Sequence, residues 1–279
     1  MQPDLRQQLI GGLKDGSIVP CLGYDILRDV TALADGRSIP ADSDSLILAM
    51  NGGKPMSRRL MYEFPRAAMN VELKRGRRVV DTFLTRTYGE TAWTRARLHD
   101  WLKEIRPPYV IDLNRDTQLQ DSYADVAHTL VVGLARTGGT EYRFRLFEYR
   151  AGVHTEIAQE AADPALPVLF KPVGTPRPRP QYVASDADYV DYITELMGGF
   201  AIPAFLKSHR KGKRYLLLGL PLTRDTERML LADILYDAAT PVGWTLIPPS
   251  RASSTKERNF CERHHLEMIA ADWEELLLA

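Results

Sequence analysis

Residues 18–23 read IVPCLG, and this short apolar run is the starting point for predicting the fold. A continuous apolar run of this length, bounded by turn-forming residues, is typical of a strand buried on both faces. Leucines repeat at helical spacing before it, up to Leu13, and Gly16 is a suitable helix stop. The segment therefore predicts a helix, a turn, a buried strand and a tight turn at Gly23.

Later parts of the chain repeat this alternation of short apolar runs and helical patterns. Strands are expected at residues 109–113, 128–134, 142–146, 168–170, 215–219, 244–247 and 266–269, and helices at residues 186–206 and 225–236. Strands that alternate with helices form a mostly parallel sheet that is covered on both faces. The expected fold class is therefore α/β.

The segment from residue 45 to residue 106 differs, because its apolar residues keep a helical period throughout. We expect it to be a helical insertion within a single domain that spans residues 1–279.

The charge balance limits the partners. Lys and Arg together number 36, as do Asp and Glu, so the formal net charge is zero. No long-range field attracts such a chain to nucleic acid or to an anionic membrane, and we expect neither as a partner. The first residues lack a secretory pattern, and no apolar run is long enough to cross a membrane. We expect a cytoplasmic protein with a small ligand.

The only cysteines are Cys21 and Cys261, and they are far apart in the sequence. They cannot supply a four-ligand structural zinc site by themselves, and no histidine stands at ligand spacing from them. We expect no zinc or other metal site, and two reduced thiols in the core.

Candidate binding residues are those that follow the buried runs, because ligands of open parallel sheets bind beyond the carboxyl ends of the strands. These positions are Gly23, Asn114 with Asp116, Gly174 with Thr175, and Gly219. A glycine after the first strand lets the backbone approach a pyrophosphate, although ordinary turns also use glycine. Asn114 and Asp116 could present an amide and a carboxylate to a ribose or a nicotinamide. The alternative is an Asx turn that caps the next helix.

Taken in order, these segments resemble the sirtuin-like domain family, in particular its zinc-free branch found in bacterial and antiphage-defence proteins. Residues 9–27 look like the helix, strand and glycine-rich loop that open the family, and residues 112–119 are similar to its Thr-Asn-Tyr-Asp strand end. Residues 171–175 and 182–189 look like its Lys-Leu-His-Gly-Ser segment and the helix entry after it. Residues 215–222, with Asp225 and Arg228, are similar to its Gly-Tyr-Ser-Leu strand end.

The resemblance implies a Rossmann-like sheet with a helical insertion and a site for NAD or ADP-ribose. It would place Gly23 under the phosphates, Asn114 and Asp116 near the nicotinamide ribose, and Gly219 near the adenosine. The remaining positions that it implies for the ligand are Asp25, Gly174 and Thr175.

The chain departs from the family at the positions that matter most for chemistry. Val173 stands where the family has the histidine that activates the ribose, and a valine handles no proton. Asp25 replaces the second loop glycine and adds a negative charge where a diphosphate would lie. The histidines considered as substitutes are predicted to be surface or packing residues: His128, His154, His209, His264 and His265.

We therefore expect a catalytically degenerate sirtuin-like protein that binds NAD or ADP-ribose weakly, or that has lost the ligand. It would act as a sensor or as an interaction scaffold, with a protein partner or a second copy of itself. The alternative is an active NAD glycohydrolase of a bacterial defence system, in which Asn114 acts with a water molecule. Protein deacetylation is not expected, because the family's deacetylases carry a zinc ribbon.

Overall fold

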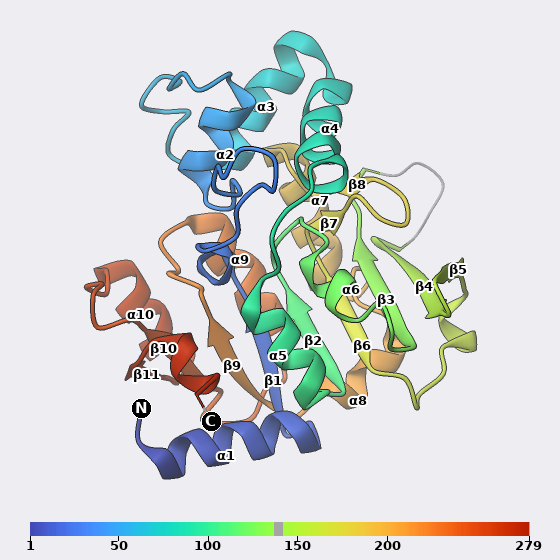
Figure 1. Ribbon diagram of the computed structural model, residues 1–279, viewed down its shortest axis with the longest axis vertical. Helices are drawn as coiled ribbons and strands as arrows, with labels where there is room; N and C mark the ends of the chain where they lie inside the picture. The colour runs from blue at the N-terminus through green and yellow to red at the C-terminus, as the bar shows by residue number, and fades with distance from the viewer. Residues whose placement is uncertain (137–141, 279) are drawn as a thin grey trace.

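The computed structural model describes residues 1–136 and 142–278 (Figure 1). Within these residues, one nine-stranded sheet has the order β11-β10-β9-β1-β2-β6-β3-β4-β5. Neighbouring strands run parallel from β11 to β3, and β4 and β5 are antiparallel at one edge. The Rossmann-like α/β fold with a mostly parallel sheet is confirmed.

The strands of this sheet are β1 (Ile18–Leu22), β2 (Tyr109–Asp112), β3 (His128–Gly133), β4 (Phe144–Arg150), β5 (Val153–Glu156), β6 (Val168–Lys171), β9 (Arg214–Leu218), β10 (Gly243–Ile247) and β11 (Leu266–Ala270). A separate two-stranded ladder joins β7 (Gly174–Thr175) to β8 (Gln181–Tyr182).

The first apolar run is β1, at the centre of the sheet. All of its residues are buried, and Cys21 lies in register with Ile111 of β2 and Leu217 of β9. Pro20 has no N–H to donate, and the pairing with β2 begins only after it, at Cys21. A continuous apolar sequence is therefore required here, since helices cover both faces of the strand.

Side chains alternate along the strands, so each face of the sheet has its own core. Ile18 and Leu22 belong to the core with α1 (Pro3–Asp15), α5 (Arg97–Ile105) and α6 (Gln118–Ser122). Val19 and Cys21 belong to the core with α7 (Asp186–Met197), α9 (Asp225–Ile234) and α10 (Thr255–Arg263). Figure 1 shows α5 and α6 in front of the sheet and α1 below it.

The helices α2 (Ser43–Met50), α3 (Phe64–Arg75) and α4 (Arg77–Thr85) lie beyond the carboxyl ends of the central strands (Figure 1). A π-helical turn, η2 (Arg86–Glu90), continues α4. The helical period expected over residues 45–106 is interrupted by turns at residues 51–63, where Gly52 and Gly53 have positive φ. We call the segment from α2 to η2 the insertion.

Two further boundaries differ from the sequence expectation. The helix expected at residues 186–206 ends at Met197, because the glycines that follow end it and Gly199 adopts a positive φ. The strand expected at residues 142–146 is β4, which begins at Phe144 and runs antiparallel to β3.

The remaining described elements are short: η1 (Tyr24–Leu27), η3 (Gln159–Ala161), η4 (Ala204–Leu206), α8 (Lys207–Arg210) and η5 (Trp273–Leu276). In the described part of the chain, no helix is both long and apolar enough to cross a membrane. Cys21 and Cys261 are buried free thiols, as expected, and burial raises the pKa of both.

Candidate functional site

A small cavity lies where β1, β2, β6 and β9 end. Gly23, Asn114 and Val173 line it together with Leu220, which follows β9. The structure thus brings three strand-end positions of the sequence analysis to one place. Asp25, Asp116, Gly174, Thr175 and Gly219 do not line this cavity.

The volume of the cavity is about 60 Å³. Sites for drug-sized ligands enclose ~300–1,000 Å³, and a water molecule needs ~10–15 Å³. The cavity has room for a few water molecules but not for a dinucleotide. Side chains of Phe64, Leu113, Tyr189 and Leu230 occupy the surrounding space.

The glycines of the first loop and the β9 loop pack against each other. A Cβ on Gly23 would lie 2.4 Å from the carbonyl oxygen of Gly219, and Gly219 itself has a φ of +64°. The N–H of Gly23 donates to the carbonyl of Leu218 over 2.8 Å, and that of Asp25 donates to the carbonyl of Gly219 over 3.1 Å. These N–H groups have acceptors within the fold, so they do not point freely at a phosphate.

The carboxylate of Asp25 accepts a hydrogen bond from Arg28 over 3.2 Å, and Arg28 also pairs with Asp272 over 2.9 Å. This charge is half-buried at the surface of the loop and does not face the cavity. The expected repulsion of a diphosphate by Asp25 is therefore reduced by a paired cation.

Asn114 holds the ends of β1 and β2 together. Its side-chain N–H group donates to the carbonyl of Gly23 over 3.0 Å and to the carboxylate of Asp112 over 2.9 Å. Asp116 accepts from the N–H of Gln118 over 2.7 Å, so it forms the Asx turn that precedes α6. Asp116 thus forms the Asx turn that was the alternative considered from the sequence, whereas Asn114 has a different role within the fold, between two strand ends.

A buried ion pair lies beneath Asn114. Lys171 donates to Asp112 over 2.6 Å, and both side chains are fully buried. Burial alone would raise the pKa of Asp112, but the charge of Lys171 and the nearby His99 bring it below its ordinary value. The carboxylate of Asp112 therefore stays ionised, and it orients the amide of Asn114.

His99 was not considered in the sequence analysis, and the structure places it 3.7 Å from the carboxylate of Asp112. It is fully buried on α5, and neither ring nitrogen has a hydrogen-bond partner among the described residues. The available signal was its position on the apolar face of the helix, beside Leu98 and Leu102. Because His99 does not line the cavity, it cannot act directly on a molecule bound there.

Gly174 and Thr175 are also used within the fold. A Cβ on Gly174 would lie 2.0 Å from the carbonyl oxygen of Gln181 on the facing strand β8. The hydroxyl of Thr175 donates to the side-chain oxygen of Gln120 over 3.1 Å. Among the described residues, no histidine lines the cavity. His128, for example, stacks on Tyr149 and burial lowers its pKa to about 4.

Charged residues that were not among the candidates from the sequence also line the cavity. Arg115 donates to the carbonyl of Val183 and to the hydroxyl of Tyr189. Glu227 lines the cavity, and burial raises its pKa to about 7. The described residues contain no group of His, Cys, Asp and Glu that could hold a metal ion.

No protein-family model and no curated protein matches this chain.

Proposed function

We propose that this chain is a non-catalytic sirtuin-like module that does not cleave NAD and that acts as an interaction scaffold. The observation that carries the proposal is the closed crevice. The N–H groups of Gly23 and Asp25 donate to the β9 loop, and the remaining cavity has a volume of about 60 Å³.

The chemistry of the cavity wall supports the absence of catalysis. Val173 is buried at the position that the resemblance assigns to the histidine, and it can neither accept nor donate a proton. General acid–base assistance contributes ~10²–10⁴-fold to a reaction rate. Asn114, the remaining candidate, already uses its N–H group to join β1 and β2.

The scaffold role is supported by helices on the face of the sheet to which Val19 and Cys21 belong. α7 and α9 contact each other; α7 exposes Val190 and Met197, α9 exposes Met229, and Tyr236 follows α9. Val190, Met197, Met229 and Tyr236 are each more than half exposed. Exposed apolar side chains mark a protein-binding surface where they form one contiguous patch, and the scaffold role requires that of these four.

The test is release of nicotinamide from NAD by the full chain at micromolar protein concentration. We expect a rate equal to that of a heat-denatured control, and the same result for Val173→His, because a crevice closed by its own loops does not regain activity from one side chain. Release above the control that is abolished by Asn114→Ala would instead support the NAD glycohydrolase of a defence system.

A further inference from the structure

A groove runs between α9 and α10, on the face of the sheet opposite α5 and α6. Its volume is about 460 Å³, compared with about 60 Å³ for the closed cavity. Four residues of α9 line it at intervals of three, one and three positions: Asp225, Arg228, Met229 and Ala232. α10 lines it with four residues at the same intervals: Lys256, Asn259, Phe260 and Arg263. Each helix therefore presents one face to the groove.

The inner wall of the groove is apolar. Met229 and Phe260 hold equivalent places, since each is the third lining residue of its helix. Phe260 is only 5% exposed, whereas Met229 is 53% exposed, and Ala232 continues the wall one turn beyond Met229. α9 and α10 thus bury only part of the apolar surface between them, and an apolar side chain from outside can cover Met229.

The polar residues of the groove carry excess positive charge. Arg228, Lys256 and Arg263 line it, and among the described lining residues Asp225 is the one carboxylate. Asp225 pairs with Arg228 and, over 3.4 Å, with Lys256. Arg263 is exposed and forms no ion pair within the described residues. His264 adds no charge near neutral pH, because burial and the charge of Arg263 lower its pKa.

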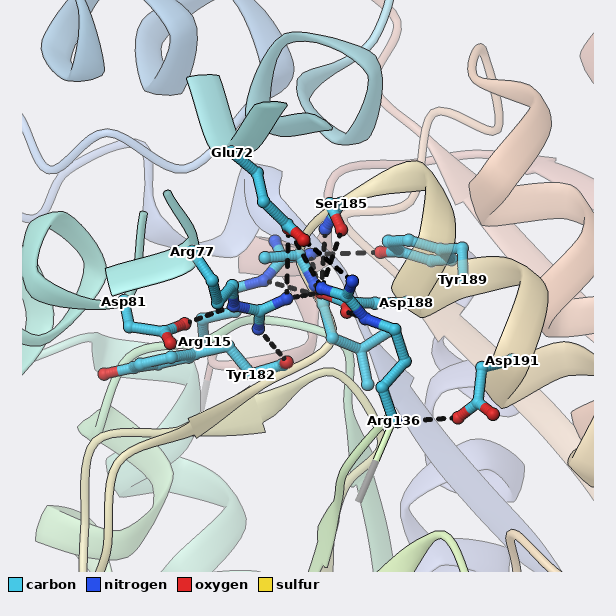
Figure 2. Close-up of polar contacts among 12 residues, drawn as sticks. Glu72, Arg77, Asp81, Arg115, Arg136, Tyr182, Ser185, Asp188, Tyr189 and Asp191 are labelled. Carbon is cyan, nitrogen blue, oxygen red and sulfur yellow. Dashed lines mark hydrogen bonds and ion pairs between the residues drawn. The ribbon is translucent and has the colours of Figure 1, made fainter. Parts of the chain in front are cut away.

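Arginines elsewhere in the structure are matched by carboxylates of the chain. Figure 2 shows Arg77 and Arg136 in contact with Asp188, which is buried on α7. Arg136 also donates to both carboxylate oxygens of Glu72 on α3, over 2.7 and 2.9 Å. Those cations stabilise the fold and leave little charge for a partner. The cations of the groove share a single carboxylate and can accept others.

The two lining faces suit a third helix. An amphipathic helix binds a groove through side chains spaced by three and four positions, which is also the spacing along α9 and α10. Positive charge beside the groove favours carboxylates on the flanks of that helix. A nucleic acid fits less well, because the inner wall is apolar and the formal net charge of the chain is zero.

We propose that the groove between α9 and α10 binds an acidic amphipathic helix of a partner protein. An apolar side chain of that helix packs on Met229 and Phe260, and its carboxylates lie beside Lys256 or Arg263. The inference rests on the proposed function, since it names the chemistry of the partner in the scaffold role. It places the contact on Met229, one of the four exposed apolar residues that support that role.

The test uses fluorescently labelled synthetic peptides and the full chain. The first peptide has leucines on one helical face and glutamates elsewhere, over ~15 residues, a length at which an isolated helix is marginally stable. The second has lysine in place of each glutamate, and the third has the residues of the first in an order that scatters the leucines. By fluorescence anisotropy, we expect the first peptide to bind with a Kd of ~10–100 μM. The other two should bind roughly tenfold more weakly or not at all.

Substitutions in the chain locate the binding. Met229→Glu puts a carboxylate on the apolar wall and Arg263→Glu reverses the unpaired charge, so each should weaken binding of the first peptide roughly tenfold. Leu73→Glu and Arg75→Glu make the same exchanges at exposed positions of α3, outside the groove, and should leave binding unchanged. All four positions are exposed, and circular dichroism checks that each variant folds.

The contrary outcomes are distinct. Failure of the first peptide to bind, or equal binding of all three peptides, overturns the acidic helix as the partner. Unchanged binding by Met229→Glu and Arg263→Glu overturns the groove as the site. Tighter binding of single-stranded DNA than of the first peptide overturns the choice of a protein. None of these results involves NAD, so release of nicotinamide would contradict the proposed absence of catalysis without altering the result for the groove.

Discussion

Gly23 meets the main chain of the β9 loop at a distance that leaves no space for a side chain. By its resemblance to the sirtuin-like family, the sequence would place this glycine under a phosphate. In the structure, the glycine instead lets one strand end pack against another, since a Cβ would lie 2.4 Å from a carbonyl oxygen. The same residue type at the same place can therefore follow from ligand contact or from packing, and only the spatial neighbour distinguishes the two.

We predict that Gly23→Ala lowers the free energy of unfolding by ~1–3 kcal/mol, the usual range for forcing an extra carbon into a packed region. Urea unfolding followed by circular dichroism measures this change. Gly11→Ala is the matched control, because Gly11 is exposed on α1 and no atom lies within 4 Å of the added Cβ. Equal stability of the two variants would contradict the packing argument for Gly23.

Glu227 predicts a pH dependence of stability. Burial, with a smaller contribution from the charge of Glu63, raises its pKa to about 7, although a backbone hydrogen bond and the charges of Arg224 and Arg228 act in the opposite direction. The folded chain therefore holds a proton on this carboxyl that the unfolded chain releases at lower pH. Its contribution to stability is present below the unfolded pKa, near 4.5, and is lost as the pH rises to about 7.

Unfolding by urea at pH 5 and pH 8, compared between the original chain and Glu227→Gln, isolates this contribution. We expect the free energy of unfolding of the original chain to fall by ~1–3 kcal/mol more than that of the variant between pH 5 and pH 8, since one pKa unit corresponds to about 1.4 kcal/mol. The same pH dependence in both proteins would show that another group is responsible.

At the scale of elements, the buried pair of Lys171 on β6 and Asp112 on β2 joins two neighbouring strands at their carboxyl ends. Lys171→Met should cost ~3–5 kcal/mol, because it leaves the carboxylate of Asp112 buried without its cation. The exposed pair of Lys103 and Asp125 provides the control, and Lys103→Met should cost at most ~1 kcal/mol. Thermal unfolding of both variants measures the difference, and equal costs would contradict the role assigned to the buried pair.

The strands could be predicted from the sequence because β1, β2, β6 and β9 are continuous apolar runs, which a strand covered on both faces requires. The ends of the helices could be predicted less accurately than the strands. The helical period continued to residue 206, whereas α7 ends at Met197 because a tight turn with Gly199 at positive φ follows. Periodicity describes which face is buried, and it does not describe where the backbone turns.

At the scale of the whole molecule, some residues of the crevice could be predicted from the sequence, but the contacts that close the crevice could not. Gly23, Asn114 and Val173 were found because they follow buried strands that end at the same edge of the sheet. Glu63 was missed because it contacts α9 across more than half of the chain, and nothing in the local sequence marks that contact. His99 was missed because its place on the apolar face of α5 indicates burial only, and its neighbour Asp112 belongs to another element.

The central claim is that the ligand-free crevice is closed by the chain itself. Calorimetric titration of the full chain with NAD and with ADP-ribose tests it most directly. We predict no saturable heat with either ligand at concentrations up to about 1 mM, corresponding to a binding free energy weaker than about −4 kcal/mol. Saturable binding of one ligand per chain with a Kd in the micromolar range, by the original protein, would contradict it.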